Sequence, residues 1–194
     1  EMRRIGRNNA DRRWDVLPQE PALASDPAQN RLLVTAAVLQ APVLDMGQDL
    51  SSHYGSFGAL VGHVLTQAVD AQGRRIDANG NVRDWWTPAD VAAWEGLLAR
   101  TGAQFDALPY PMPSGPRVNG RLVREQALND FAGMDLAERA LLQALPGASE
   151  DNRMAFYRGW SQLWAQQLSI EAATLLAAAS SEPPGQWRSN AALA

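Results

Sequence analysis

The stretch from Ser51 to Ala71 constrains the fold most, because its apolar residues recur every three or four positions. Residues at that spacing share one face of a helix. The recurring residues are Phe57, Leu60, Val61, Val64, Leu65 and Ala68. Ser51 and Ser52 are of the type favoured at a helix N-cap. The pattern therefore predicts a helix with one apolar face.

The rest of the chain predicts further helices and little β structure. Leu32 to Leu39 is β-branched and aliphatic, which predicts a strand that ends before Ala41-Pro42. Further helices are predicted over residues 87–100, 122–145, 150–167 and 169–179. The expected organisation is one domain over 1–194, with an irregular segment (1–30), a strand region (31–50) and a helical body (51–194).

Composition excludes several classes of protein. With 194 residues, 46% of them hydrophobic and 20% charged, the chain suits one globular domain or one lobe of a larger protein. The net charge of −4 argues against nucleic-acid binding. No apolar run approaches the roughly 18 residues of a membrane span. The absence of cysteine excludes disulfides, thiolate metal sites and cysteine nucleophiles.

His63 and Gln67 lie four residues apart, so on the predicted helix they project from one face. Zinc hydrolases use this spacing with two histidines and a glutamate beside the first as general base. Here the neighbouring residue is Val64, and an amide oxygen is a poor ligand for zinc. On spacing alone, a core or hydrogen-bonded histidine is the favoured interpretation.

Other local patterns indicate structure rather than function. Asp77 to Asn81 is similar to a calcium loop, but its glycine is at the fourth position and no glutamate closes it, so a plain turn is expected. Gly55, Gly58 and Gly62 fit close helix packing better than a phosphate loop. Four tryptophans are expected in the core, the first pair having groove lining as an alternative role: Trp85, Trp86, Trp160 and Trp164.

Three ordered blocks resemble the neprilysin family of zinc metallopeptidases. Gly58 to Trp86 resembles the family's active-site helix and following loop, Val118 to Gly133 resembles the segment with the third zinc ligand, and Pro183 to Asn190 resembles its Ser-Pro-Gly-x-x-Arg-x-Asn. Matches in the first block are Gly62, His63, Thr66, Asp70, Gly73, Arg74, Asp77, Gly80, Asp84, Trp85 and Trp86. The resemblance covers nearly the whole chain. It implies an α+β, mainly α fold: a thermolysin-like zincin catalytic lobe with a small β element before the active-site helix.

The resemblance also implies that each matched block has lost catalytic residues. The first zinc histidine is kept as His63, the general base falls on Val64, and the other two ligands fall on Gln67 and Gln126. Glu125 is no substitute, because it points about 100° round the helix from Gln126. Moving the register to use it would break the match at Asn119, Gly120, Asp130 and Gly133.

Around the implied site, some positions match the family and others do not. Asp130 matches the aspartate that hydrogen-bonds a zinc-ligating histidine, and is expected to hold His63 without a metal. The family's transition-state histidine falls on Glu182, whose charge has the wrong sign to stabilise an oxyanion. Its substrate-gripping Asn-Ala-Tyr falls on residues 22–24, which are Ala22, Leu23 and Ala24. Arg188 matches the substrate-carbonyl arginine and is expected either to bind a peptide or to form an ion pair, for example with Asp130.

The expected protein is therefore a catalytically inactive pseudopeptidase with no catalytic residues, no zinc and no other cofactor. Loss of a general base alone slows hydrolysis by about 10²- to 10⁴-fold. It would act as a binding, structural or regulatory subunit, paired with an active homologous peptidase or with the helical lobe that this chain lacks. Peptide binding through Arg188 is one expected role. The resemblance favours a periplasmic or secreted location.

Two alternatives to this expectation stay open. The first is an active zinc endopeptidase with a variant metal site formed by His63, Gln67 and Gln126. The second is a purely structural domain without a peptide groove. Val64, which has no proton-accepting atom, argues against the enzyme.

Overall fold

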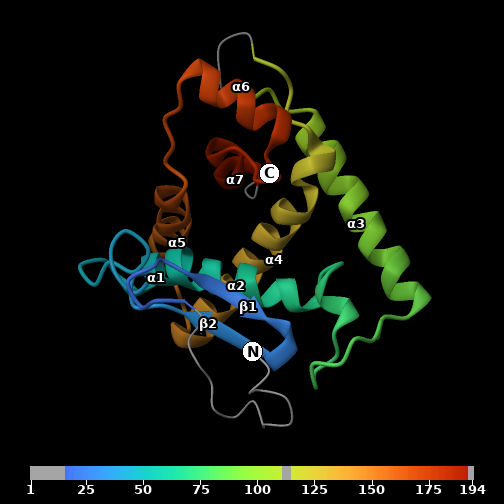
Figure 1. The fold of residues 1–194 in the computed structure, drawn as a ribbon. Helices are drawn as coiled ribbons and strands as arrows, with labels where there is room; N and C mark the ends of the chain where they lie inside the picture. Colours follow the sequence, from blue (N-terminus) through green and yellow to red (C-terminus); the bar gives the residue numbers. More distant parts are fainter. Residues whose placement is uncertain (1–15, 111–114, 192–194) are drawn as a thin grey trace.

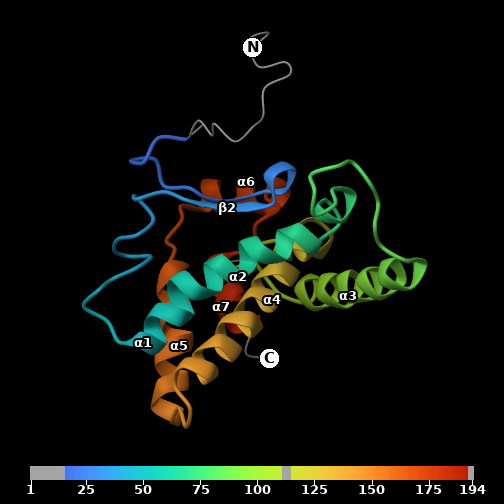
Figure 2. The ribbon, with the colours of Figure 1, turned by 90° about the horizontal axis from the view of Figure 1, so that it is seen from below.

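The structure, a computed structural model, describes residues 16–110 and 115–191. A β hairpin lies along the helix that carries His63, and the other helices pack beneath and around that helix (Figures 1 and 2). The expected mainly helical chain with a small β element is thus confirmed. In the described part of the chain, none of the helices has the length and apolar character needed to span a membrane.

The hairpin consists of β1 (Leu23–Asp26) and β2 (Arg31–Val34), which pair antiparallel with Leu23 opposite Val34. A short 3₁₀ turn (Pro27–Gln29) joins them and ends at Asn30, whose φ of 45° is left-handed. The expectation of irregular chain over 1–30 is wrong at β1; residues 1–15 of that segment lie outside the described residues. The predicted strand over 32–39 is shorter, because the chain turns after Thr35, whose carbonyl accepts the backbone N–H of Val38.

The predicted helix over 51–71 is present but is built from several pieces. It contains α1 (Leu50–His53), the π-helical turn η3 (Tyr54–Gly58), α2 (Ala59–Thr66) and the 3₁₀ turn η4 (Gln67–Val69). Its N-cap is Asp49, whose carboxylate accepts the backbone N–H of Ser52, rather than either predicted serine. The helix ends in the turn before Asp70.

The helical body continues with five more helices. They are α3 (Pro88–Asp106), α4 (Gly120–Ala144), α5 (Glu150–Leu163), α6 (Ile170–Ala179) and α7 (Gly185–Asn190). α7 was not expected from the sequence, because six residues after two prolines carry too little periodicity to reveal a helix. The other four occur where helices were predicted, with α3 longer and α5 shorter than expected.

Two apolar clusters form the core, one along the N-terminal half of α4 and the other along its C-terminal half. One contains Phe105 from α3 and Val123 and Ala127 from α4, and the other packs Ala59 of α2 against Phe156 and Trp160 of α5. Trp160 is thus in the core as expected, and Trp164 is half-buried beside it. Trp85 is 42% exposed, so its expected core position is wrong; the pocket against Trp94 and Arg74 is taken by Trp86 alone.

The turn at Asp77 is a plain turn, as predicted. One carboxylate oxygen of Asp77 accepts the backbone N–H groups of Asn79 and Asn81, each at 2.9 Å. Gly80 occupies the left-handed region with φ of 80°, where a side chain would be strained. The carboxylate is thereby used to shape the loop.

Candidate functional site

The site is built where α2 crosses α4 at a pair of glycines. A Cβ on Gly62 would lie 2.4 Å from the carbonyl oxygen of Gly133, and a Cβ on Gly133 would lie 2.3 Å from the backbone nitrogen of His63. Real side chains do not approach so closely, so both positions require glycine. The expectation that Gly62 serves close helix packing is confirmed, and the crossing brings His63 beside Asp130.

His63 and Asp130 form a buried hydrogen bond across this crossing. Nδ1 of His63 lies 2.8 Å from Oδ1 of Asp130, and the two residues are 8% and 1% exposed. A carboxylate only accepts, so Nδ1 carries the proton and, in the neutral ring, Nε2 presents its lone pair. The expected contact is therefore present, and it fixes the orientation of the ring.

Asp130 is also the partner of Arg188. The guanidinium donates two hydrogen bonds to Asp130, from Nε to Oδ2 and from Nη2 to Oδ1, both at 2.7 Å. Such a paired geometry gives strong, oriented contacts. Of the two roles expected for Arg188, the ion pair is present.

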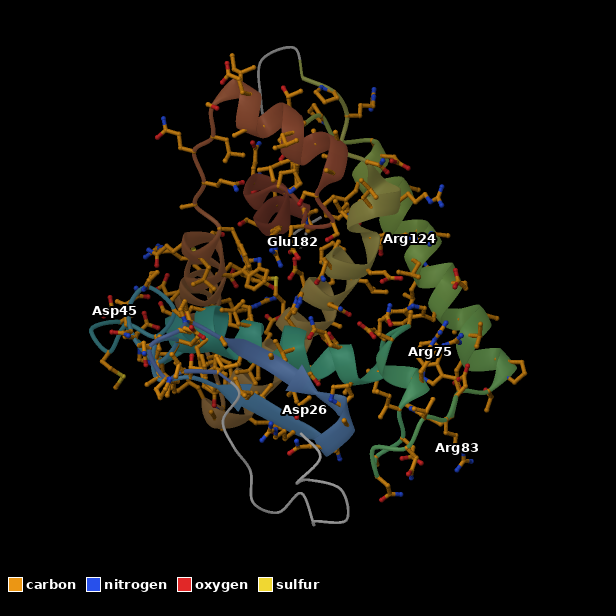
Figure 3. The ribbon with its side chains drawn as sticks, in the orientation of Figure 1. Asp26, Asp45, Arg75, Arg83, Arg124 and Glu182 are labelled. Atoms are coloured by element: carbon orange, nitrogen blue, oxygen red, sulfur yellow. The ribbon has the colours of Figure 1, made fainter. Side chains whose placement is uncertain are left out.

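Two further contacts hold the Arg188 side chain in place. Its Nη1 donates to Oε2 of Glu182 at 2.9 Å, and Glu182 lies in the space between α7 and α4 (Figure 3). Its Cζ lies 3.5 Å from the ring centroid of Trp164, a cation–π contact. The contact with Trp164 was missed from the sequence, in which no signal pairs the two residues.

The three positions implied for zinc chemistry carry only one imidazole. The amide nitrogen Nε2 of Gln67 lies 3.4 Å from Nε2 of His63, and Val64 is buried. Gln126 is half-buried, and its Oε1 has no hydrogen-bond partner. Over residues 16–110 and 115–191, no three His, Cys, Asp or Glu side chains come together in a way that could hold a metal ion. One imidazole with two amides does not fit zinc, which prefers imidazole, thiolate and carboxylate.

A cavity of about 540 Å³ adjoins these positions and lies between β1, the end of α2, and α4. Gln67 and Gln126 belong to its wall, whereas His63 and Arg188 do not. The lining residues are Ser25, Pro27, Gln67, Asp70, Gln72, Gly73, Ile76, Leu122, Glu125, Gln126, Asn129 and Ser181. Asn129 was not predicted here, although its spacing of three residues from Gln126 would have placed both on one face of α4.

Among the described residues, the edge of β1 away from β2 has no strand paired with it, and this edge lies beside the cavity. Thr35 donates its backbone N–H to the carbonyl of Ala22, in register with the β1–β2 pairing. The backbone groups of Ala24 therefore point to β2, and those of Leu23 and Ser25 point to the other edge. Ser25 also lines the cavity. Ala22, Leu23 and Ala24, onto which the resemblance places the substrate-gripping residues, thus lie in or next to this strand.

Comparisons with known proteins agree with this architecture. The sequence model of peptidase family M13 matches residues 25–194. An endothelin-converting enzyme homolog of Locusta migratoria is 29% identical over 185 residues, which are 91% of this chain and 25% of that protein. A neutral endopeptidase of Lactobacillus helveticus is 36% identical over 116 residues, which are 59% of this chain and 17% of that protein.

Solved structures of similar proteins share the fold. The zinc metalloprotease Zmp1 of Mycobacterium tuberculosis, in complex with an inhibitor, superposes with a TM-score of 0.85 at 26% identity, covering 97% of this chain and 30% of Zmp1. PepO of Lactobacillus rhamnosis superposes with a TM-score of 0.79 at 30% identity, covering 93% of this chain and 28% of PepO. The chain therefore spans 17–25% of these curated relatives and under a third of these structures. The expected fold class is confirmed.

Proposed function

The chain belongs to peptidase family M13, and on that premise we propose that it is a pseudopeptidase, which binds peptide or a partner protein without hydrolysing peptide bonds. The observation that carries the proposal is the set of side chains at the three ligand positions. His63 is the only imidazole there, and amides stand at Gln67 and Gln126. Without a bound metal, the pKa of water is not lowered towards neutrality, and water is a poor nucleophile.

The position of the general base supports the same conclusion. Val64 has only hydrocarbon in its side chain and is buried. The remaining acid near His63 is Asp130, whose two oxygens already accept three hydrogen bonds from His63 and Arg188. This carboxylate is therefore occupied in holding the helices together and is not free to activate a water molecule.

Peptide binding is supported by the edge of β1. Leu23 and Ser25 direct backbone N–H and C=O groups away from β2, and an extended peptide can add to such an edge as a further strand. The Arg188 guanidinium has five N–H donors, and three of them donate to carboxylates. Two donors remain with which Arg188 would bind a peptide carbonyl.

The length of the match supports a role beside a second lobe. The chain corresponds to 25% of the Locusta migratoria relative and 30% of Zmp1. We propose that the unit works with a helical lobe, from the same polypeptide or from an active homologous peptidase. In that setting it would be a structural or regulatory half of a peptide-binding chamber.

Zinc content is the experiment that tests the proposal. The purified protein is dialysed against a weak chelator and its zinc measured by elemental analysis, beside an assay with a quenched fluorescent peptide. We expect less than about a tenth of an equivalent of zinc and no hydrolysis. Near one equivalent of zinc, together with hydrolysis that a strong chelator abolishes, would overturn the proposal in favour of a variant metal site.

A further inference from the structure

The cavity beside β1 has a strongly uneven charge. Two of its lining residues, Asp70 and Glu125, are acidic, and the described residues of its wall include no lysine, arginine or histidine. Glu125 is half-buried and forms no ion pair within the described parts of the chain. A half-buried carboxylate without a partner favours a cation beside it.

Asn129 supplies an independent observation in the same wall. It is 2% exposed, and its Nδ2 donates to Oδ2 of Asp70 at 3.4 Å. This contact orients the amide, because turning it over would set its oxygen against a carboxylate. The oxygen Oδ1 is left buried without a hydrogen-bond partner. Buried acceptors of this kind are unfavourable unless a donor reaches them.

Gln126 adds a second acceptor one turn earlier on α4. Its Oε1 is also buried without a partner, and its side chain lines the same cavity. The wall thus offers two amide oxygens and the carboxylate of Glu125. An ammonium group has three donors and no acceptor, and a guanidinium has five donors. Both can donate to these three acceptors.

We propose that this cavity binds the cationic side chain of a lysine or arginine in a peptide that lies along β1. The inference rests on the proposed peptide-binding function and names the chemistry that the site selects. Ser25 both lines the cavity and directs its backbone groups to the free edge of β1, so a peptide on that edge passes the cavity mouth. The volume of about 540 Å³ is within the range of ligand sites.

The test compares peptides that differ at one residue. N-acetylated, fluorescein-labelled nonapeptides carry lysine, arginine, norleucine or glutamate at the centre and are titrated with the purified chain by fluorescence anisotropy at low salt. We expect the lysine and arginine peptides to bind about tenfold more tightly than the norleucine peptide. The glutamate peptide should bind most weakly, and the preference should shrink in high salt.

Three variants locate the effect. Glu125→Gln removes the charge and Asn129→Ala removes the acceptor, and each should weaken the lysine peptide by about fivefold or more while leaving the norleucine peptide unchanged. Glu95→Gln is the matched control, because Glu95 is exposed on α3 and is not part of the wall. If Glu125→Gln and Glu95→Gln weakened binding of the lysine peptide equally, the assignment of the cation site to this cavity would be overturned.

The outcomes separate this inference from the function on which it rests. Equal binding of the lysine and norleucine peptides would overturn the inference alone. A further probe, N-acetyl-lysine amide at millimolar concentration, should shift the NMR signal of the Asn129 side-chain amide. If this probe shifts the Asn129 signal while no peptide binds, the cavity is a cation site but the proposal of peptide binding along β1 is wrong. Absence of that shift would overturn the cavity assignment.

Discussion

Asp130 lies at the centre of the site and joins His63 of α2 to Arg188 of α7, although 67 and 58 residues separate it from them in the sequence. Its carboxylate is 1% exposed and accepts every one of the three hydrogen bonds within 2.8 Å. One buried residue thus connects three helices. If Asp130 were removed, three N–H groups, one of His63 and two of Arg188, would lose their acceptor.

Asp130→Ala should therefore lower the free energy of unfolding by about 3–5 kcal/mol, because it leaves the buried charge of Arg188 without its partner. Urea unfolding followed by tryptophan fluorescence measures this change. Asp135→Ala is the control on the same helix, since Asp135 pairs with Arg139 on the surface and should lose under about 1 kcal/mol. Similar losses in the two variants would show that the buried network contributes little.

Gly62→Ala should destabilise the protein by at least about 2 kcal/mol, because the new Cβ would meet the backbone of Gly133 and push α2 from α4. Thermal unfolding by circular dichroism measures the change. Gly96→Ala is the matched control in the interior of α3, where a Cβ would lie 3.9 Å from Nη1 of Arg100; this substitution should stabilise the protein by about 0.5–1 kcal/mol. A neutral Gly62→Ala would contradict the close crossing.

The double substitution Gln67→His with Gln126→Glu should create a zinc site with His63. Two imidazoles and a carboxylate are a ligand set that zinc hydrolases use. Competition with a chromogenic chelator should show about one equivalent bound, and the control, Gln67→Ala with Gln126→Ala, should bind none. Failure of the double variant to bind zinc would show that the three positions do not converge as the resemblance implies.

The N-cap of α1 should make the free energy of unfolding depend on pH in the acidic range. The backbone N–H of Ser52, with help from its hydroxyl, lowers the pKa of Asp49 below its ordinary value of 3.8. A group whose pKa is lower when folded stabilises the protein above its unfolded pKa, and this contribution is lost as pH falls through the folded value.

Asp49→Ala should lower the free energy of unfolding by about 0.5–1 kcal/mol at pH 7. This is the low end of the range for loss of an N-cap, because Asp49 is exposed. The difference from the unsubstituted protein should narrow below about pH 4, where the unfolded carboxyl is protonated. Urea unfolding at a series of pH values measures it. A difference that stays constant down to pH 2 would show that the charge of the cap contributes nothing.

Helical periodicity and turn residues predicted four helices of the body and the helix that carries His63, because amphipathic spacing is a local property of the chain. β1 was missed for the opposite reason. Leu23–Asp26 has no β-branched residue and becomes a strand only through its pairing with β2. The π-helical turn at Tyr54–Gly58 likewise depends on tertiary packing, since Gly55 meets the backbone of Phe156.

At the site, the motif matches predicted that Asp130 would hold His63, and the structure contains that bond. The cavity beside it was beyond prediction. Its character depends on Asn129, whose burial and unpaired oxygen follow from how α4 faces Asp70 and are not visible in the order of residues. The exposure of Trp85 was missed similarly, because the order of residues does not show that Trp86, rather than Trp85, packs against Trp94.

The glycine crossing of α2 and α4 has a consequence for the history of such a chain. Gly62 and Gly133 set the separation of the two helices by contact of one backbone with another, so the side chains of Gln67 and Gln126 do not set that separation. Residues at these two positions can therefore change without altering the crossing itself. Chemistry can then be lost from the family without loss of its architecture, and the same frame is open to new ligands.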